Sequence, residues 1–126
     1  MLCLRSLTAS VVGSLAFLIA QPALAQTSAP PGYVVLEFTI KDPEGFRDYA
    51  QRTPPTVQQY GGRFVVRPGK IVSVTGEAPK GAFAIVAFPS AEQAQKWVSS
   101  PEYSALKAQR DKAADARIFI VEGAAP

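Results

Sequence analysis

The sequence predicts an α+β domain with the ferredoxin-like order β-α-β-β-α-β, in which an antiparallel sheet carries its helices on one face. Two observations predict it. Four segments are rich in β-branched and aromatic residues, as strands are. Helix-start signals follow the first and the third of these segments, so the helices alternate with strands as this order requires. The expected strands cover residues 33–40, 63–67, 82–88 and 117–122.

The first strand and helix follow from alternation and from proline positions. Along Tyr33–Ile40, alternate residues form one wholly apolar face and one mixed face. Asp42-Pro43-Glu44 then begins a helix, because Asp caps free amides, Pro fits the first helical position and Glu complements the helix dipole. Thr53-Pro54-Pro55 predicts an interruption, since Pro lacks the amide. A second helical piece then runs from Pro55 to Tyr60, and Gly61-Gly62 ends it.

The second and third strands enclose a long loop. Arg63–Arg67 alternates basic and apolar residues, which indicates a strand. Pro68-Gly69 marks a turn or bulge, and Ile71–Thr75 is expected to continue in extended form. Ala82–Phe88 is almost uniformly apolar, which is typical of a central strand buried on both faces.

The last helical region carries two cap signals. Ser90 opens a capping-box pattern, and Ser100 starts either a further helix or a kinked continuation. Trp97 falls on the apolar stripe between them, so we expect it in the core. Arg110, with the lysines around it, is interpreted as part of a solvated helix face.

Residues 1–25 have the three-part pattern of a secretory signal peptide. Arg5 supplies the positive start, residues 7–20 are apolar, and Ala23-Leu24-Ala25 provides small residues before Gln26. The apolar run is short for a membrane-spanning helix, which needs about 20 residues. We therefore expect cleavage after Ala25, a periplasmic or secreted protein and no stable membrane anchor, with a retained anchor as the alternative. The expected divisions are a signal peptide (1–25), a disordered lead-in (26–32), one domain (33–123) and a tail (124–126).

Two absences from the sequence exclude most familiar enzyme mechanisms. The chain has no His and one Cys, Cys3, which lies in the signal peptide. Without His there is no Ser-His-Asp system and no His-ligated metal or haem. Without paired Cys there is no disulfide or CxxC motif, so we expect no metal and no cofactor. A net charge of +3 without a Lys/Arg cluster gives no reason to expect nucleic acid as a partner.

The face of the sheet away from the helices predicts a homodimer. Its residues include Tyr33, Val35, Phe83 and Ile85 or their alternates. This is more exposed apolar area than a monomer usually tolerates. Face-to-face pairing of two copies is the simplest way to cover it.

A set of motifs carries a resemblance to a known family. The motifs are Asp42-Pro43 with Phe46 and Tyr49, the run Tyr60–Arg67, Phe88-Pro89-Ser90, Trp97, Ser100–Tyr103, Arg110 and Val121-Glu122-Gly123. With them the chain resembles, over Tyr33–Gly123, the bacterial family catalogued as domain of unknown function 1330, in the dimeric α/β-barrel superfamily. It departs in its signal peptide and at Arg67-Pro68-Gly69, where a Gly-Gly pair would be more usual. The resemblance implies the fold and the dimer but no activity.

Candidate site residues lie on the polar sides of two strands that we expect to be neighbours. Arg63 and Arg67, with Glu37, would surround a small cavity closed by a partner subunit. The planar guanidinium matches a carboxylate, which favours a small organic acid as ligand. Glu37 is the candidate general base, and Tyr33 and Tyr60 are candidate binding residues. The alternative is structural: an ion pair that fixes strand or dimer register, and tyrosines that pack locally.

Two functions are therefore open. The first is an exported dimeric protein that binds a small acidic organic molecule in the cleft between sheet and partner. The second is a cofactor-independent enzyme that abstracts a proton from a small carbonyl or carboxylate substrate. Relatives in the superfamily include cofactor-free oxygenases, lactone isomerases and haem-degrading enzymes, which is an analogy of fold alone.

Overall fold

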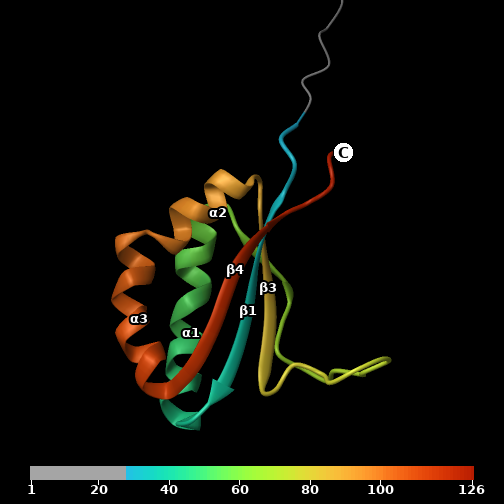
Figure 1. The fold of residues 1–126 in the computed structure, drawn as a ribbon. Coiled ribbons are helices and arrows are strands. Elements are labelled where there is room, and N and C mark those ends of the chain that lie inside the picture. Colours follow the sequence, from blue (N-terminus) through green and yellow to red (C-terminus); the bar gives the residue numbers. More distant parts are fainter. Residues whose placement is uncertain (1–27) are drawn as a thin grey trace, which may run out of the picture.

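The computed structural model describes residues 28–126, which form the predicted ferredoxin-like α+β arrangement (Figure 1). The four strands make one antiparallel sheet in the order β2-β3-β1-β4. In chain order the elements are β1 (Gly32–Ile40), α1 (Pro43–Gln59), β2 (Arg63–Val66), β3 (Ala82–Phe88), α2 (Ala91–Val98), α3 (Pro101–Ala113) and β4 (Ala114–Glu122). The three helices cover one face of the sheet, so the expected fold class is confirmed.

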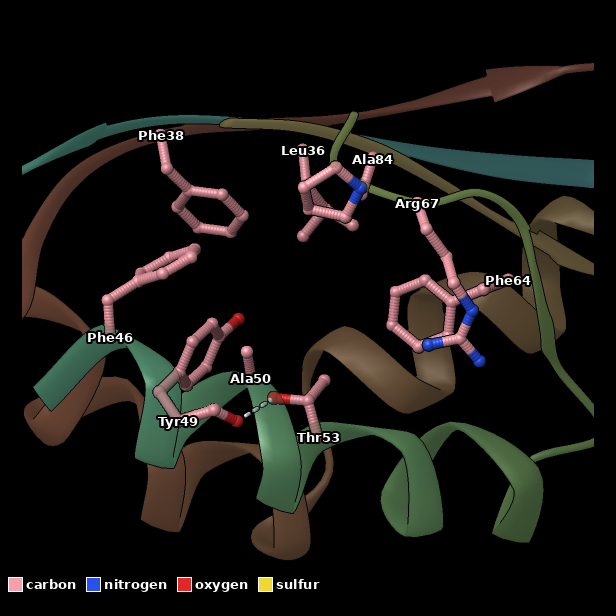
Figure 2. A pocket seen from close by; sticks show the side chains of 10 residues that line it. Leu36, Phe38, Phe46, Tyr49, Ala50, Thr53, Phe64, Arg67 and Ala84 are labelled. Carbon is pink, nitrogen blue, oxygen red and sulfur yellow. Dashed lines mark hydrogen bonds between the residues drawn. The ribbon is translucent and has the colours of Figure 1, made fainter. Parts of the chain in front are cut away.

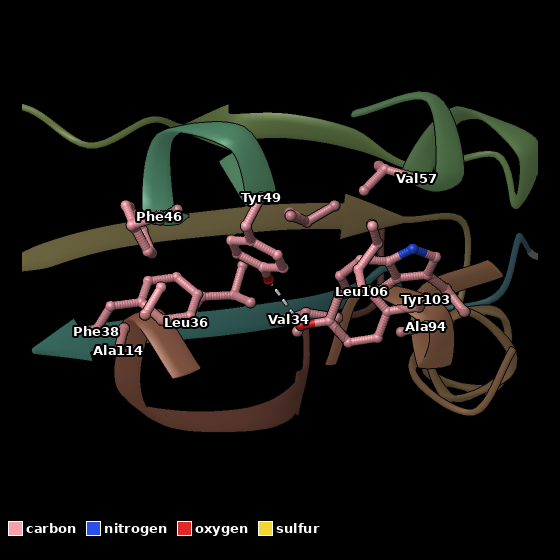
Figure 3. Packing of buried hydrophobic residues seen from close by; sticks show 14 of the residues in the cluster. Val34, Leu36, Phe38, Phe46, Tyr49, Val57, Ala94, Tyr103, Leu106 and Ala114 are labelled. Atoms are coloured by element: carbon pink, nitrogen blue, oxygen red, sulfur yellow. Dashed lines mark hydrogen bonds between the residues drawn. The ribbon is translucent and has the colours of Figure 1, made fainter. Parts of the chain in front are cut away.

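The hydrophobic core fills the space between the sheet and the helices (Figure 3). Alternate residues of β1 are buried, namely Val34, Leu36 and Phe38, which is the apolar face that the alternation predicted. Trp97 of α2 and Tyr103 of α3 are both 0% exposed, and their ring centroids lie 4.2 Å apart. The predicted core position of Trp97 is therefore confirmed.

The helix starts lie where the sequence places them. Asp42 accepts a hydrogen bond from the amide of Glu44 at the start of α1. Ser90 caps α2 and Ser100 caps α3, each through its side-chain oxygen. At the other end of α1, Gly61 takes a φ of 77°, a left-handed conformation that glycine adopts without strain. Local capping chemistry thus determines these boundaries.

The predicted interruption of the first helix is wrong, because α1 runs unbroken through Pro54-Pro55. The two prolines deprive the carbonyls of Ala50 and Gln51 of their amide partners. Both of those residues are exposed, so water can replace the lost bonds. On the buried side, the Thr53 hydroxyl donates to the Tyr49 carbonyl at 2.7 Å. Packing of this side against the sheet therefore outweighs the local preference of proline.

The extended continuation expected after the second strand is also wrong. Strand β2 ends at Val66, and its pairing with β3 is irregular between Phe64 and Val66. Residues 67–81 form no strand, and most of this segment projects from the sheet on the side away from the helices (Figure 1). Their apolar side chains are largely in solvent, with Val74 93% exposed, so no burial favours an ordered strand there.

The N-terminal predictions are largely outside the described residues. The signal peptide and the cleavage after Ala25 fall within 1–27 and stay predictions. Gly32, placed by the sequence in the disordered lead-in, is instead the first residue of β1. A Cβ at Gly32 would lie 2.5 Å from the Ser90 carbonyl oxygen, so glycine lets this strand end approach α2. Within 28–126, none of the helices combines the length and the apolarity that crossing a membrane needs.

Candidate functional site

The expected cluster of Glu37, Arg63 and Arg67 does not form, because β3 lies between β1 and β2. Arg63 is opposite Ala87 of β3, which is in turn opposite Tyr33 of β1. Glu37 lies four residues further along β1, about 13 Å at the usual rise of a strand. The expectation that the two strands are neighbours is therefore wrong.

Glu37 instead pairs with Arg117 of the adjacent strand β4, its direct partner in register. The guanidinium donates from Nε to Oε2 at 2.8 Å and from Nη2 to Oε1 at 3.0 Å. These hydrogen bonds lower the pKa of Glu37 from its usual value, against a smaller opposing effect of desolvation. A lowered pKa makes a carboxylate the weaker base, so the predicted base role would require Arg117 to move away.

The pairing of Glu37 with Arg117 predicts a pH-dependent stability. A carboxyl with a lowered pKa stabilises the fold above its unfolded-state pKa and loses this contribution as pH falls through the folded-state pKa. We expect Glu37→Gln to lower the urea midpoint at about pH 7, and this difference from the parent protein to shrink as pH falls below about 4. A difference in urea midpoint that stays constant with pH would show that packing, and not charge, makes Glu37 stabilising.

The two candidate tyrosines lie apart from each other. Tyr33 is on the face of β1 away from the helices, where its ring lies against Gly123. Tyr60 follows α1, and its hydroxyl donates to Glu102 at 2.8 Å. That hydrogen bond and partial desolvation raise the pKa of Tyr60. Neither side chain lines the pocket described next, and a binding role for either stays a prediction.

An apolar pocket of about 80 Å³ lies between α1, the helix-side face of the sheet and the segment after β2 (Figure 2). Strands contribute Leu36, Phe38, Phe64 and Ala84, helix α1 contributes Phe46, Tyr49, Ala50 and Thr53, and the following segment contributes Arg67 and Pro68. The alternation of β1 places its apolar face here, and the 3.6-residue repeat of α1 turns its aromatic residues toward it. Of the predicted site residues, only Arg67 reaches this pocket.

Arg67 is the single charged residue among those that line the pocket. Its guanidinium carbon lies 5.0 Å from the centroid of the Phe64 ring, a cation–π arrangement that holds it at the pocket wall. Among residues 28–126 its guanidinium forms no hydrogen bond or ion pair that would occupy its N–H groups. Those donors are therefore available to an anionic or carbonyl group.

Behind the pocket, a hydrogen-bond chain joins two tyrosines, which Figure 3 shows, to an arginine. The hydroxyl oxygens of Tyr49 and Tyr103 lie 2.9 Å apart, and Nη1 of Arg110 donates to Tyr103 at 2.9 Å. The interpretation of Arg110 as a solvated residue is wrong, because its side chain is only 11% exposed. Burial opposes its charge, but Tyr103 and Asp111 together raise its pKa.

Sequence reasoning missed the role of Tyr49, although a signal was present. Phe46 and Tyr49 are three residues apart, a spacing that places them on one face of the helix predicted after Asp42, and a tyrosine there needs a buried partner for its hydroxyl. Tyr103 and Arg110 are seven residues apart, two helical turns on one face of α3. What the sequence does not give is the contact between α1 and α3 that brings the three together.

Metal binding has no support in the described part of the chain. Within 28–126 no group of three or more His, Cys, Asp or Glu side chains could hold a metal ion. On the other face of the sheet, Glu37, Lys80 and Arg117 line a wider depression that is open to solvent. Because it is more open, its charged groups stay hydrated, which makes it a poorer small-molecule site than the apolar pocket beside α1.

One family matches the sequence, and it does so over most of the chain. The family described as "Domain of unknown function (DUF1330)" matches residues 31–124. None of the curated proteins matches the sequence.

Solved structures share the fold at low sequence identity. A protein of unknown function from Rhodopseudomonas palustris has a TM-score of 0.60 and 18% identity, covering 77% of this chain and 85% of its own. SnoaB, a cofactor-independent oxygenase from Streptomyces nogalater, has a TM-score of 0.55 and 13% identity, and the match covers 78% of this chain and 97% of SnoaB. A hypothetical protein from Arabidopsis thaliana has a TM-score of 0.57 and 15% identity, and the match covers 81% of this chain and 96% of that protein. At these identities the likeness is one of fold alone.

Proposed function

The chain belongs to the DUF1330 family, whose description assigns no activity, and we propose from its pocket that it binds a small organic acid. The observation that carries the proposal is a partly enclosed apolar pocket with one charged residue, Arg67, in its lining. An apolar body would fill the space between the aromatic rings, and its carboxylate would pair with the guanidinium. This places the ligand on the helix side of the sheet, away from the cleft with a partner subunit that the sequence suggested.

The pocket sets an upper size for the ligand. A water molecule needs about 10–15 Å³ of such volume, so about 80 Å³ holds roughly six waters. We infer a ligand of about six to ten non-hydrogen atoms, which is the size of a single ring with one carboxylate. Benzoate and cyclohexanecarboxylate are therefore suitable first probes.

Two arginine variants test both the binding and its location. We expect Arg67→Ala to weaken benzoate binding in calorimetry about tenfold or more, because a charge-assisted hydrogen bond is lost. Arg63→Ala removes an exposed arginine from the same strand region but outside the pocket, so it should leave affinity unchanged. Affinity that depends on Arg63 and not on Arg67 would refute the pocket and favour the other sheet face.

A second candidate function is cofactor-independent catalysis in the same pocket. The observation that favours it is the buried hydroxyl of Tyr49, which could donate a hydrogen bond to a developing oxyanion. Glu37, the base expected from the sequence, lies on the opposite face of β1 and cannot reach this pocket, so a substrate proton would pass to solvent water or hydroxide. Exchange of the α-protons of a bound oxo acid for deuterium should then exceed the buffer rate. Exchange at the buffer rate would leave binding as the only function.

We also propose that two copies pair through the face of the sheet away from the helices. Val35, Phe83 and Ile85 are half-buried there, and Phe119 and Val121 remain 40% and 45% exposed. A second copy would supply the same apolar side chains in a self-complementary contact. The ion pair of Glu37 lies within this face, and burial would strengthen its charge–charge attraction.

Light scattering on a charge variant tests the dimer. We expect the parent protein to be a dimer at micromolar concentration and Phe119→Glu to be a folded monomer, because a carboxylate would be desolvated in the contact. Lys112→Glu is the matched control: it changes an exposed residue of α3 outside the proposed contact, so this variant should remain dimeric. A monomeric parent protein would refute the proposal.

A further inference from the structure

The direction of the buried hydrogen-bond chain can be derived from its donors. Arg110 has only N–H donors, so Tyr103 must accept the 2.9 Å bond from Nη1. Tyr103 is 0% exposed, and its hydroxyl proton needs an acceptor. The only other polar atom bonded to that hydroxyl within 28–126 is the Tyr49 oxygen at 2.9 Å. Tyr103 therefore donates to Tyr49, and not the reverse.

This direction leaves the proton of Tyr49 without a well-formed hydrogen bond to a protein acceptor. Tyr49 is 3% exposed, and apart from Tyr103 the polar group that acts on its hydroxyl among the described residues is the Thr53 side chain. The Thr53 hydroxyl uses its own proton on the Tyr49 carbonyl, so its oxygen can only accept from Tyr49, in a contact that lacks the geometry of a normal hydrogen bond. Figure 2 shows the phenol oxygen of Tyr49 at the edge of the pocket, on the side away from Arg67. An oxygen atom in the pocket would be a better-placed acceptor for this proton than Thr53 is.

We propose that Tyr49 donates a hydrogen bond to a second oxygen of the ligand, a carbonyl or a comparable acceptor, and that Tyr103 and Arg110 are positioning residues for this bond. The inference rests on the proposed function and narrows it, from an organic acid to an oxo acid. The carboxylate would lie at Arg67 and the second oxygen at Tyr49. A chain of donors that begins at a guanidinium polarises each following hydroxyl, which makes Tyr49 the stronger donor.

The protonation state of Tyr49 agrees with a donor role. Burial, followed by the neighbouring Tyr103, raises the pKa of Tyr49 well above its usual value. The phenol therefore keeps its proton throughout the neutral range. It is suited to bind an acceptor oxygen and not to act as a base.

Matched ligands test the inference on the unmodified protein. Cyclohexanecarboxylate and its 3-oxo and 4-oxo derivatives have nearly the same shape, and only the derivatives carry a second acceptor. We expect at least one oxo acid to bind about 3- to 10-fold more tightly in calorimetry. Its C=O stretch should move to lower wavenumber in the bound state. Equal affinities together with an unshifted stretch would overturn the inference and leave the proposed function intact.

Three variants assign the effect to the chain of donors. Tyr49→Phe should abolish both the affinity difference and the shift. Tyr103→Phe and Arg110→Gln should retain binding of the parent acid but reduce the C=O shift of the bound oxo acid. If these two residues had a purely structural role, their replacement would not change that shift. Tyr60→Phe, which removes a phenol outside the pocket, is the control and should change neither. An unchanged shift in Tyr49→Phe would overturn the inference.

A negative binding screen would still decide the inference separately. If no acid binds, the proposed function fails. A crystal structure would then have to show a pocket water within hydrogen-bonding distance of the Tyr49 hydroxyl, about 2.7–3.0 Å. A pocket without a polar atom at that position would overturn the inference as well.

Discussion

Replacing Trp97 with Ala is expected to remove about 3–5 kcal/mol of stability, a large share of the 5–15 kcal/mol typical of a domain. Trp97 is 0% exposed, and its ring lies 4.2 Å from Tyr103 and 5.5 Å from Phe88 between ring centroids. Its Nε1 donates to the Thr56 hydroxyl at 3.0 Å, which ties α2 to α1. Truncation would leave a cavity and remove this bond between helices, while the Thr56 hydroxyl would still donate to the Thr53 carbonyl. Urea denaturation measures the loss.

Two further variants separate the contributions of Trp97. Trp97→Phe retains much of the buried area and loses the hydrogen bond, so we expect an intermediate loss of about 1–3 kcal/mol. Lys96→Ala, one residue away and exposed, removes only an ion pair with Glu92 and should change stability by less than about 0.5 kcal/mol. A loss below about 1 kcal/mol for Trp97→Ala would contradict the packing described for the core.

The sequence predicted the elements well where local chemistry decides them. The caps at Asp42, Ser90 and Ser100 involve atoms within three residues, so short patterns are sufficient to recognise them. The same local reasoning was wrong at Pro54-Pro55, because buried contacts of the surrounding turns outweigh two missing amides. Local preference is reliable only where no packing opposes it.

The candidate site was harder to predict because it depends on contacts between distant elements. Glu37 and Arg63 were placed on neighbouring strands, although the predicted ferredoxin-like topology itself places the third strand between them. Arg67 was named from its chemistry, but an alternating pattern assigned it to the wrong face, since the irregularity in β2 shifts the register before it. Arg110 is buried because α1 packs against α3, which no pattern within α3 indicates.

Gly81→Ala is expected to destabilise the protein by about 3 kcal/mol or more and to weaken ligand binding at the same time. Gly81 has a φ of 84°, where an L side chain is strained by about 1–2 kcal/mol. Its added Cβ would also lie in collision with the backbone oxygen of Phe38 in β1. That atom is part of the sheet, where Phe38 pairs with Ala82, so it cannot move without disturbing β1–β3 pairing.

Two other glycines between β2 and β3 separate strain from collision. Gly76 has a φ of 74° with no atom near an added Cβ, so Gly76→Ala should lose only the strain, about 1–2 kcal/mol. Gly69 has neither a positive φ nor a collision, since the atom nearest to an added Cβ is the Arg67 carbonyl oxygen at 3.8 Å. Gly69→Ala should therefore leave the stability nearly unchanged. If Gly76→Ala lost as much stability as Gly81→Ala, the collision with Phe38 would not be the cause. Phe38 also lines the pocket, so of the three glycine variants only Gly81→Ala should weaken benzoate binding. That result would connect the end of the loop between β2 and β3 to the ligand site.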